Sequence, residues 1–106
     1  MLQIKVEILI PLNYNDGSPV EDDKLIQTYD EIVERFTACS MDNSTIKGRW
    51  MNPESKVYHD DINRSIWIIC DNNEDNRMFF RNFKQGLQER FKQDSILICI
   101  NDVSVI

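Results

Sequence analysis

The stretch "QIKVEILI", residues 3–10, alternates between apolar and polar side chains and decides how the rest of the chain is interpreted. Its even-numbered positions are all Ile or Val, whereas positions 3, 5 and 7 are polar. A period of two residues is typical of a β-strand with one buried face. Pro11 follows, and because proline has no N–H it ends regular pairing. We therefore expect a strand at residues 3–10 whose even face is covered by other elements.

The next segment, "SPVE" at residues 18–21, has the residues that start a helix. Ser18 is placed as the N-cap, Pro19 as the first helical residue and Glu21 as the side chain that reaches back to the cap. Apolar residues then recur every three or four positions up to Phe36, so we predict a helix over residues 19–38. The polar loop before it is interpreted as a turn, because its oxygen ligands do not have the spacing of a calcium-binding loop.

The second half of the chain repeats the alternation of strand and helix patterns. Residues 44–50 and 57–70 are predicted to form a long hairpin around the turn at Asn52 and Pro53, with a broken outer arm at residues 57–62. A second helix is expected to begin at Asn72 or Asn73 and to carry an apolar stripe as far as Phe91. The final strand is predicted at residues 95–100, with a weaker extension through Val105.

The order of these elements is strand, helix, strand, strand, helix, strand, which is the split βαβ pattern. It predicts an α+β protein of the ferredoxin-like βαββαβ type, a two-layer sandwich. Right-handed crossovers would give a four-stranded antiparallel sheet with the first and third strands in the centre and two helices on one face. A length of 106 residues predicts a single domain, residues 1–106.

Composition excludes several classes of protein. The formal net charge is −6 and the sequence pI is about 4.6, which makes nucleic-acid binding unlikely because that binding relies on Lys and Arg. Charged residues interrupt the N-terminal apolar run, so no signal peptide is expected, and no run of about 20 apolar residues could span a membrane. The three cysteines form no CxxC pair and are interpreted as reduced thiols. These features favour an acidic cytoplasmic protein.

Two of the predicted strands are apolar on both faces, although the helices can cover only one. The residues expected on the uncovered face are Leu9, Trp67, Ile69, Leu97 and Cys99. A contiguous apolar patch on a soluble protein usually marks an interaction site. We expect self-association there, most simply as a homodimer. The alternatives are that residues 101–106 fold back over the patch, or that a ligand covers it.

One cluster on the predicted hairpin has the residue types that dominate recognition surfaces. It comprises Arg49, Trp50, Tyr58, Asp60 and Arg64. The alternative is that these side chains pair across the strands and only steady the hairpin. His59 is the single histidine and has no Ser or Cys placed beside it. A metal site formed by His59, Asp60 and Asp61 is not expected, because consecutive strand residues point to opposite faces. We predict no catalytic residues, no metal and no cofactor.

Four segments of the chain carry a resemblance to other proteins. They are "IPLNYNDGSPV" (10–20), "EIVERF" (31–36), "GRWMNPESKVYHDD" (48–61) and "NRMFFRNFKQGLQERFKQDSI" (76–96). Through them the chain resembles a group of small bacterial proteins of unassigned function. The resemblance implies the same βαββαβ shape and brings no activity, cofactor or catalytic residue.

The function predicted from the sequence is a non-enzymatic, homo-oligomeric cytoplasmic protein. It would bind a partner or a small ligand at the sheet face or at the hairpin. The first alternative is a small cofactor-free or metal-dependent enzyme of the dimeric ferredoxin-like type, by analogy of fold alone. The second alternative is a ligand-sensing regulatory domain, which a ligand-dependent shift in thermal stability would reveal.

Overall fold

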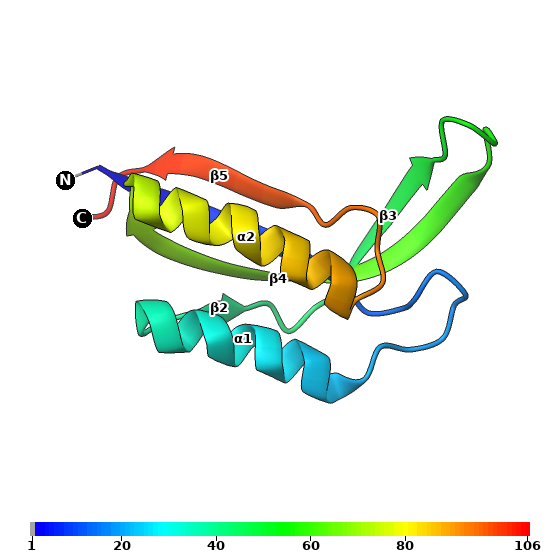
Figure 1. The fold of residues 1–106 in the computed structure, drawn as a ribbon, viewed down its shortest axis with the longest axis horizontal. Coiled ribbons are helices and arrows are strands. Elements are labelled where there is room, and N and C mark those ends of the chain that lie inside the picture. Colours follow the sequence, from blue (N-terminus) through cyan, green and yellow to red (C-terminus); the bar gives the residue numbers. More distant parts are fainter. Residues whose placement is uncertain (1) are drawn as a thin grey trace.

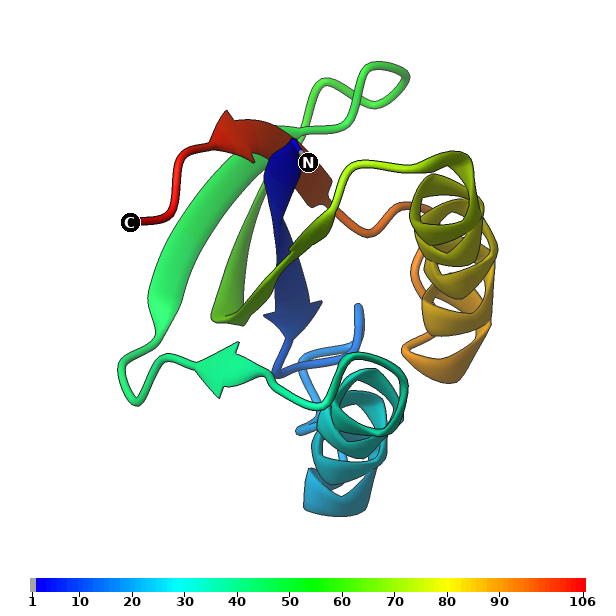
Figure 2. The ribbon, with the colours of Figure 1, turned by 90° about the vertical axis from the view of Figure 1, so that its left-hand side faces the viewer.

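A computed structural model describes residues 2–106 and shows both helices on one face of an antiparallel sheet (Figure 1, Figure 2). The elements are β1 (Gln3–Pro11), α1 (Asp22–Phe36), β2 (Ser40–Met41), β3 (Ile46–Met51), β4 (Tyr58–Asp71), α2 (Glu74–Arg90) and β5 (Ile98–Val103). The path through the sheet is β2-β4-β1-β5, with β1 and β4 in the centre. The predicted α+β, ferredoxin-like arrangement is confirmed.

The sheet has five strands, one more than predicted. The reason is that β4 is an unbroken strand of 14 residues that has different neighbours along its length. Its outer part, from Tyr58 to Asn63, pairs with β3, whereas Ile66 and Trp67 of its inner part pair with β2. The predicted break at residues 57–62 is therefore wrong. β2 has only two residues, so its sequence contains no alternation from which a strand could be predicted.

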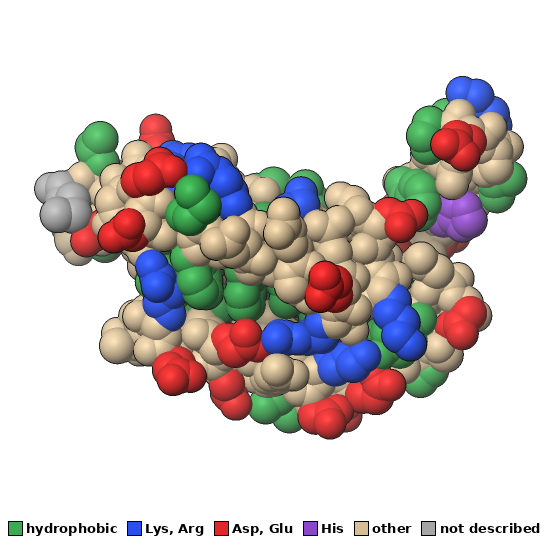
Figure 3. Space-filling model, viewed as in Figure 1, with side chains coloured by type: hydrophobic (Ala, Val, Ile, Leu, Met, Phe, Trp, Pro, Cys, Tyr) green, Lys and Arg blue, Asp and Glu red, His purple; other side chains and the backbone are tan. Residues whose placement is uncertain are grey.

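Because β3 pairs only with β4, residues 46–63 form a two-stranded hairpin arm that projects from the body (Figure 1). Figure 3 shows hydrophobic side chains on this arm, next to the histidine. The exposed apolar residues of the arm are Ile46, Trp50, Met51, Val57, Tyr58 and Ile62. The arm therefore presents a group of exposed apolar side chains, a feature that often marks an interaction site.

The core lies between the sheet and the two helices. It is built from the even-numbered residues of β1 and of the inner part of β4, together with one face of each helix. The buried apolar residues are Ile4, Val6, Ile8, Ile10, Ile32, Ile66, Ile68, Cys70, Phe80, Leu87, Phe91 and Ile96. Each large side chain buried in this way stabilises the fold by about 1.5–3 kcal/mol. No helix within residues 2–106 is long and apolar enough to cross a membrane.

The start of α1 differs from the prediction. The helix begins at Asp22, and its N-cap residue is Glu21, which makes no side-chain capping bond. Ser18 instead donates to the carboxylate of Asp16, from its Oγ at 2.5 Å and from its backbone N at 2.8 Å. Pro19 forms an isolated β-bridge with Asn13, so it is extended and is not the first helical residue. Ser18, which the capping pattern assigned to the helix, therefore stabilises the turn before it.

The start of α2 agrees with the prediction. The two predicted N-caps, Ser18 and Asn73, can therefore be compared by mutation. Asn73 Oδ1 accepts a hydrogen bond from the backbone N of Asn76 at 2.9 Å. We expect Asn73→Ala to lower the free energy of unfolding by about 1 kcal/mol, as loss of an N-cap does. Ser18→Ala should have a smaller effect, because Ser18 caps no helix. Urea denaturation of both variants measures this, and a larger loss for Ser18→Ala would contradict the assignment.

Candidate functional site

The hairpin arm has two faces, and they divide the predicted recognition cluster. Trp50 pairs with His59 on one face, whereas Arg49 pairs with Asp60 on the other. Tyr58 shares the face of Asp60, since residues two apart in a strand point the same way. Trp50 therefore lies on the opposite face of the arm from the side chains of Arg49, Tyr58 and Asp60.

Arg49 and Asp60 satisfy each other across the strands. Arg49 Nε lies 2.6 Å from Asp60 Oδ1, and Nη2 lies 3.2 Å from Oδ2, so the contact is bidentate. The hydrogen bond from Arg49 holds the pKa of Asp60 below its usual value. Arg64 lies further along β4, opposite Ile10, and its buried Nε has no hydrogen-bond partner. The Arg49–Asp60 contact matches the alternative interpretation, in which the cluster steadies the hairpin.

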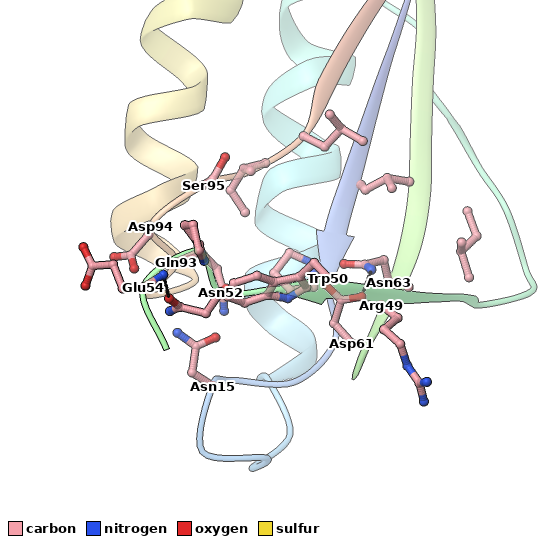
Figure 4. Close-up of a pocket in the computed structure, with 17 residues that line it drawn as sticks. Asn15, Arg49, Trp50, Asn52, Glu54, Asp61, Asn63, Gln93, Asp94 and Ser95 are labelled. Atoms are coloured by element: carbon pink, nitrogen blue, oxygen red, sulfur yellow. Dashed lines mark hydrogen bonds between the residues drawn. The ribbon is translucent and has the colours of Figure 1, made fainter. Parts of the chain in front are cut away.

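A cavity of about 690 Å³ lies where the arm meets the body (Figure 4). Its volume is in the range of small-molecule sites, about 300–1,000 Å³. The wall is formed by the Trp50 face of the arm, by the end of β1 and by the loop between α2 and β5. The lining residues are Leu9, Pro11, Asn15, Ile46, Gly48, Arg49, Trp50, Asn52, Pro53, Glu54, Asp61, Asn63 and residues 93–97. We call this space the arm cavity.

One wall of the arm cavity is a carboxylate that lies across a glycine. Asp61 pairs with Gly48, and a Cβ on Gly48 would come closer than 3.0 Å to Asp61 Oδ1. Only glycine leaves room for the carboxylate in this position. Asn63 Nδ2 donates to the same oxygen at 3.1 Å, and Asn63 is itself buried. The three residues form a fixed polar wall.

The arm cavity also has an aromatic surface, which is the indole ring of Trp50. Trp50 stacks on His59 with ring centroids 4.8 Å apart and an interplanar angle of 26°. Trp50 nevertheless remains 46% exposed, and Figure 4 shows it within the group of side chains that line the cavity. An exposed aromatic face beside amides and carboxylates is suited to a ligand that has a flat ring and polar edges.

The charges around the arm cavity are mainly negative. Glu54, Asp61 and Asp94 line it, whereas the one basic lining residue, Arg49, is bound to Asp60. A site with this charge balance favours a ligand that carries a positive charge. Within residues 2–106, no three His, Cys, Asp or Glu side chains are grouped to hold a metal ion.

The five residues predicted for self-association lie on the sheet face opposite the helices, which we call the open sheet face. These are Leu9, Trp67, Ile69, Leu97 and Cys99. Ile69 and Leu97 are exposed, and the Lys5 ammonium lies 4.5 Å from the ring centroid of Trp67. Of the segment 101–106, which was considered as a cover for this face, residues 101–103 are the end of β5 and pair with β1, and residues 104–106 are exposed. Leu9 and Leu97 also line the arm cavity, which the sequence did not indicate.

Sequence reasoning missed most of the cavity. Two residues of the polar wall were given other roles in the sequence analysis. Gly48 was included only within the predicted strand at residues 44–50, and Asp61 was considered only as a metal ligand. The pairing register of the hairpin could have indicated this wall. It places Gly48 opposite Asp61, and a glycine leaves space for the side chain of the residue that it pairs with. Asn15, Gln93 and Asp94 come from segments that the sequence predicts as connections. Residues 95–97 were predicted as the start of the final strand, but β5 begins only at Ile98.

The chain was compared with known proteins. No protein-family model and no curated protein matches it. Among solved structures it is similar to a phage SAM lyase in complex with S-methyl-5'-thioadenosine, with a TM-score of 0.75 and 20% identity over 94% of this chain and 81% of that one. A phage SAM lyase in the apo state gives a TM-score of 0.70, with 20% identity over 95% and 81%. At this identity the likeness shows a common fold.

This likeness overturns the prediction of a non-enzymatic protein. The prediction rested on the missing catalytic motifs, but the two similar solved structures named above are those of a phage SAM lyase. The absence of a histidine-based triad does not exclude enzymatic activity.

The polar wall makes a prediction about stability. Alanine in a strand is favoured over glycine by about 0.5–1 kcal/mol, unless a neighbour occupies the space of the Cβ. Gly48→Ala should therefore raise the free energy of unfolding only when Asp61 is also replaced by alanine. Chemical denaturation of both single variants and the double variant measures this coupling. Equal effects of Gly48→Ala in the two backgrounds would show that Asp61 does not lie over Gly48.

Proposed function

We propose that the protein binds S-adenosylmethionine (SAM) in the arm cavity and cleaves it, releasing S-methyl-5'-thioadenosine. The observation that carries this proposal is the fold shared with a phage SAM lyase that holds S-methyl-5'-thioadenosine, at a TM-score of 0.75 over 94% of this chain. The enzymatic alternative considered from the sequence, a small cofactor-free enzyme of ferredoxin-like fold, is thereby the favoured function.

The chemistry of the reaction fits a site without a catalytic triad. The sulfonium of SAM is already an activated leaving group. The substrate's own carboxylate can attack Cγ of the amino-acid chain, while the electron pair of the C–S bond passes to sulfur. The products are a neutral thioether and a lactone, and no outside proton or cofactor is needed. The protein has to hold a reactive conformer and exclude water, which are contributions of binding and orientation.

The lining of the arm cavity supports a nucleoside ligand. The exposed face of Trp50 can stack on adenine, an interaction worth about 1–3 kcal/mol per base. The side chains of Asn15, Asn52 and Gln93 also line the cavity and offer amide donors and acceptors for the edge of a base. The proposal retains the predicted cytoplasmic location, which three free cysteines fit.

We retain self-association at the open sheet face as a second proposal. Ile69 is 39% exposed and Leu97 is 55% exposed, next to the partly buried Trp67 and Cys99. A patch of this kind on a single chain favours a partner surface, and a second copy is the simplest partner.

Purified protein incubated with SAM should produce S-methyl-5'-thioadenosine, measured by liquid chromatography. Trp50→Ala should lower kcat/KM by about tenfold or more, because it removes the stacking surface. Tyr58→Ala is the matched control, since it removes an aromatic ring from the opposite face of the same arm. No binding and no cleavage of SAM by the unchanged protein would refute the proposed function.

Light scattering tests the proposed self-association. The unchanged protein should have a mass that is a multiple of the 12.5 kDa chain. Ile69→Lys should shift it to a single chain, because it places a charge in the apolar contact. Ile26→Lys, at an isoleucine of α1 that is 56% exposed, should leave the mass unchanged. A single-chain mass for the unchanged protein at micromolar concentration would end this proposal.

A further inference from the structure

We infer that Asp61 makes the arm cavity selective for a positively charged ligand. The inference rests on the proposed function and assigns one determinant of its specificity. SAM carries a positive charge on sulfur, whereas the thioether left by its cleavage is neutral at that atom. A carboxylate at this position binds the substrate more tightly than the product.

The first support is the way in which the carboxylate is held. Asp61 Oδ1 lies over the backbone of Gly48, where any larger residue would displace it. It accepts a hydrogen bond from Asn63 Nδ2 at 3.1 Å. Asn63 is only 8% exposed, so this donor is fixed by the surrounding structure. A carboxylate that is hydrogen-bonded to a fixed donor loses less conformational entropy when a ligand binds.

The second support is that Asp61 has no cationic partner among residues 2–106. The ion pairs are Lys24–Glu21, Arg49–Asp60, Arg81–Glu74 and Arg90–Glu31. Arg49 is next to Gly48 in the chain, but it engages Asp60 on the other face of the arm. The charge of Asp61 is therefore available to a ligand.

The third support is the apolar lining beside this carboxylate. Leu9, Ile46 and Ile96 line the same cavity. A ligand that fills the cavity displaces water, and the attraction between two charges becomes stronger as the local dielectric falls. This attraction is lost when the sulfonium becomes a neutral thioether. Asp61 therefore holds the substrate more tightly than the product, which leaves the site more easily.

Calorimetric titration with two uncleaved ligands tests the inference. Sinefungin has a protonated amine in place of the sulfonium methyl, and S-adenosylhomocysteine has a neutral sulfur. The unchanged protein should bind sinefungin about tenfold more tightly than S-adenosylhomocysteine, given the attraction expected for a partly screened pair. Asp61→Asn keeps the acceptor for Asn63, so it should remove this preference while leaving the Kd of S-adenosylhomocysteine within about twofold. Asp102→Asn, which removes the same charge at the far end of the sheet, should retain the preference.

The outcomes separate the two proposals. If the unchanged protein binds neither ligand, the proposed function fails. If it binds both but Asp61→Asn keeps the tenfold preference, only the inference about Asp61 fails. An equal loss of affinity for both ligands would also overturn it, because Asp61 would then position the ligand without sensing its charge. Thermal melting of each variant confirms that the protein titrated is folded.

Discussion

The structure depends on the way in which one long strand, β4, serves two purposes. Its inner part is fixed by the burial of Ile66 and Ile68 beneath the helices, which sets the register with β1. Because the strand continues without a break, the same register determines which side chains face the cavity further out. A slip of one residue would turn Asp61 and Asn63 to the opposite face and would expose the core isoleucines. The hydrophobic core thus positions the polar wall of the arm cavity.

The parts of the fold that could be predicted are those with strong periodicity. The even face of β1 and the alternation around Trp67 correctly indicate the central strands and the open sheet face. β2 is too short to have a period, and the start of α1 was misplaced because Ser18 has the chemistry of both a cap and a turn. The resemblance to small proteins of unassigned function adds no activity, which agrees with the lack of a matching family model. These failures occur where local signals are ambiguous.

The candidate site was harder to predict because its lining comes from segments far apart in the chain: the hairpin arm, the end of β1 and residues 93–97. Trp50 was identified from its residue type, whereas Asp61 was judged only against metal ligation. Leu9 and Leu97 were assigned to an oligomer face, and the structure places them also in the cavity wall. The non-enzymatic prediction was overturned by the two similar structures of a phage SAM lyase. A search of the sequence for nucleophiles and bases would not detect the proposed reaction, in which the substrate supplies its own reacting groups.

The central claim is that a nucleoside thioether occupies the arm cavity. A crystal structure of the protein grown with S-methyl-5'-thioadenosine tests this claim most directly. The account predicts ligand density between the hairpin arm and the 93–97 loop, with adenine against Trp50 and the sulfur on the side of Asp61. Density for the ligand at another surface, or an arm cavity filled by the protein's own side chains, would contradict it.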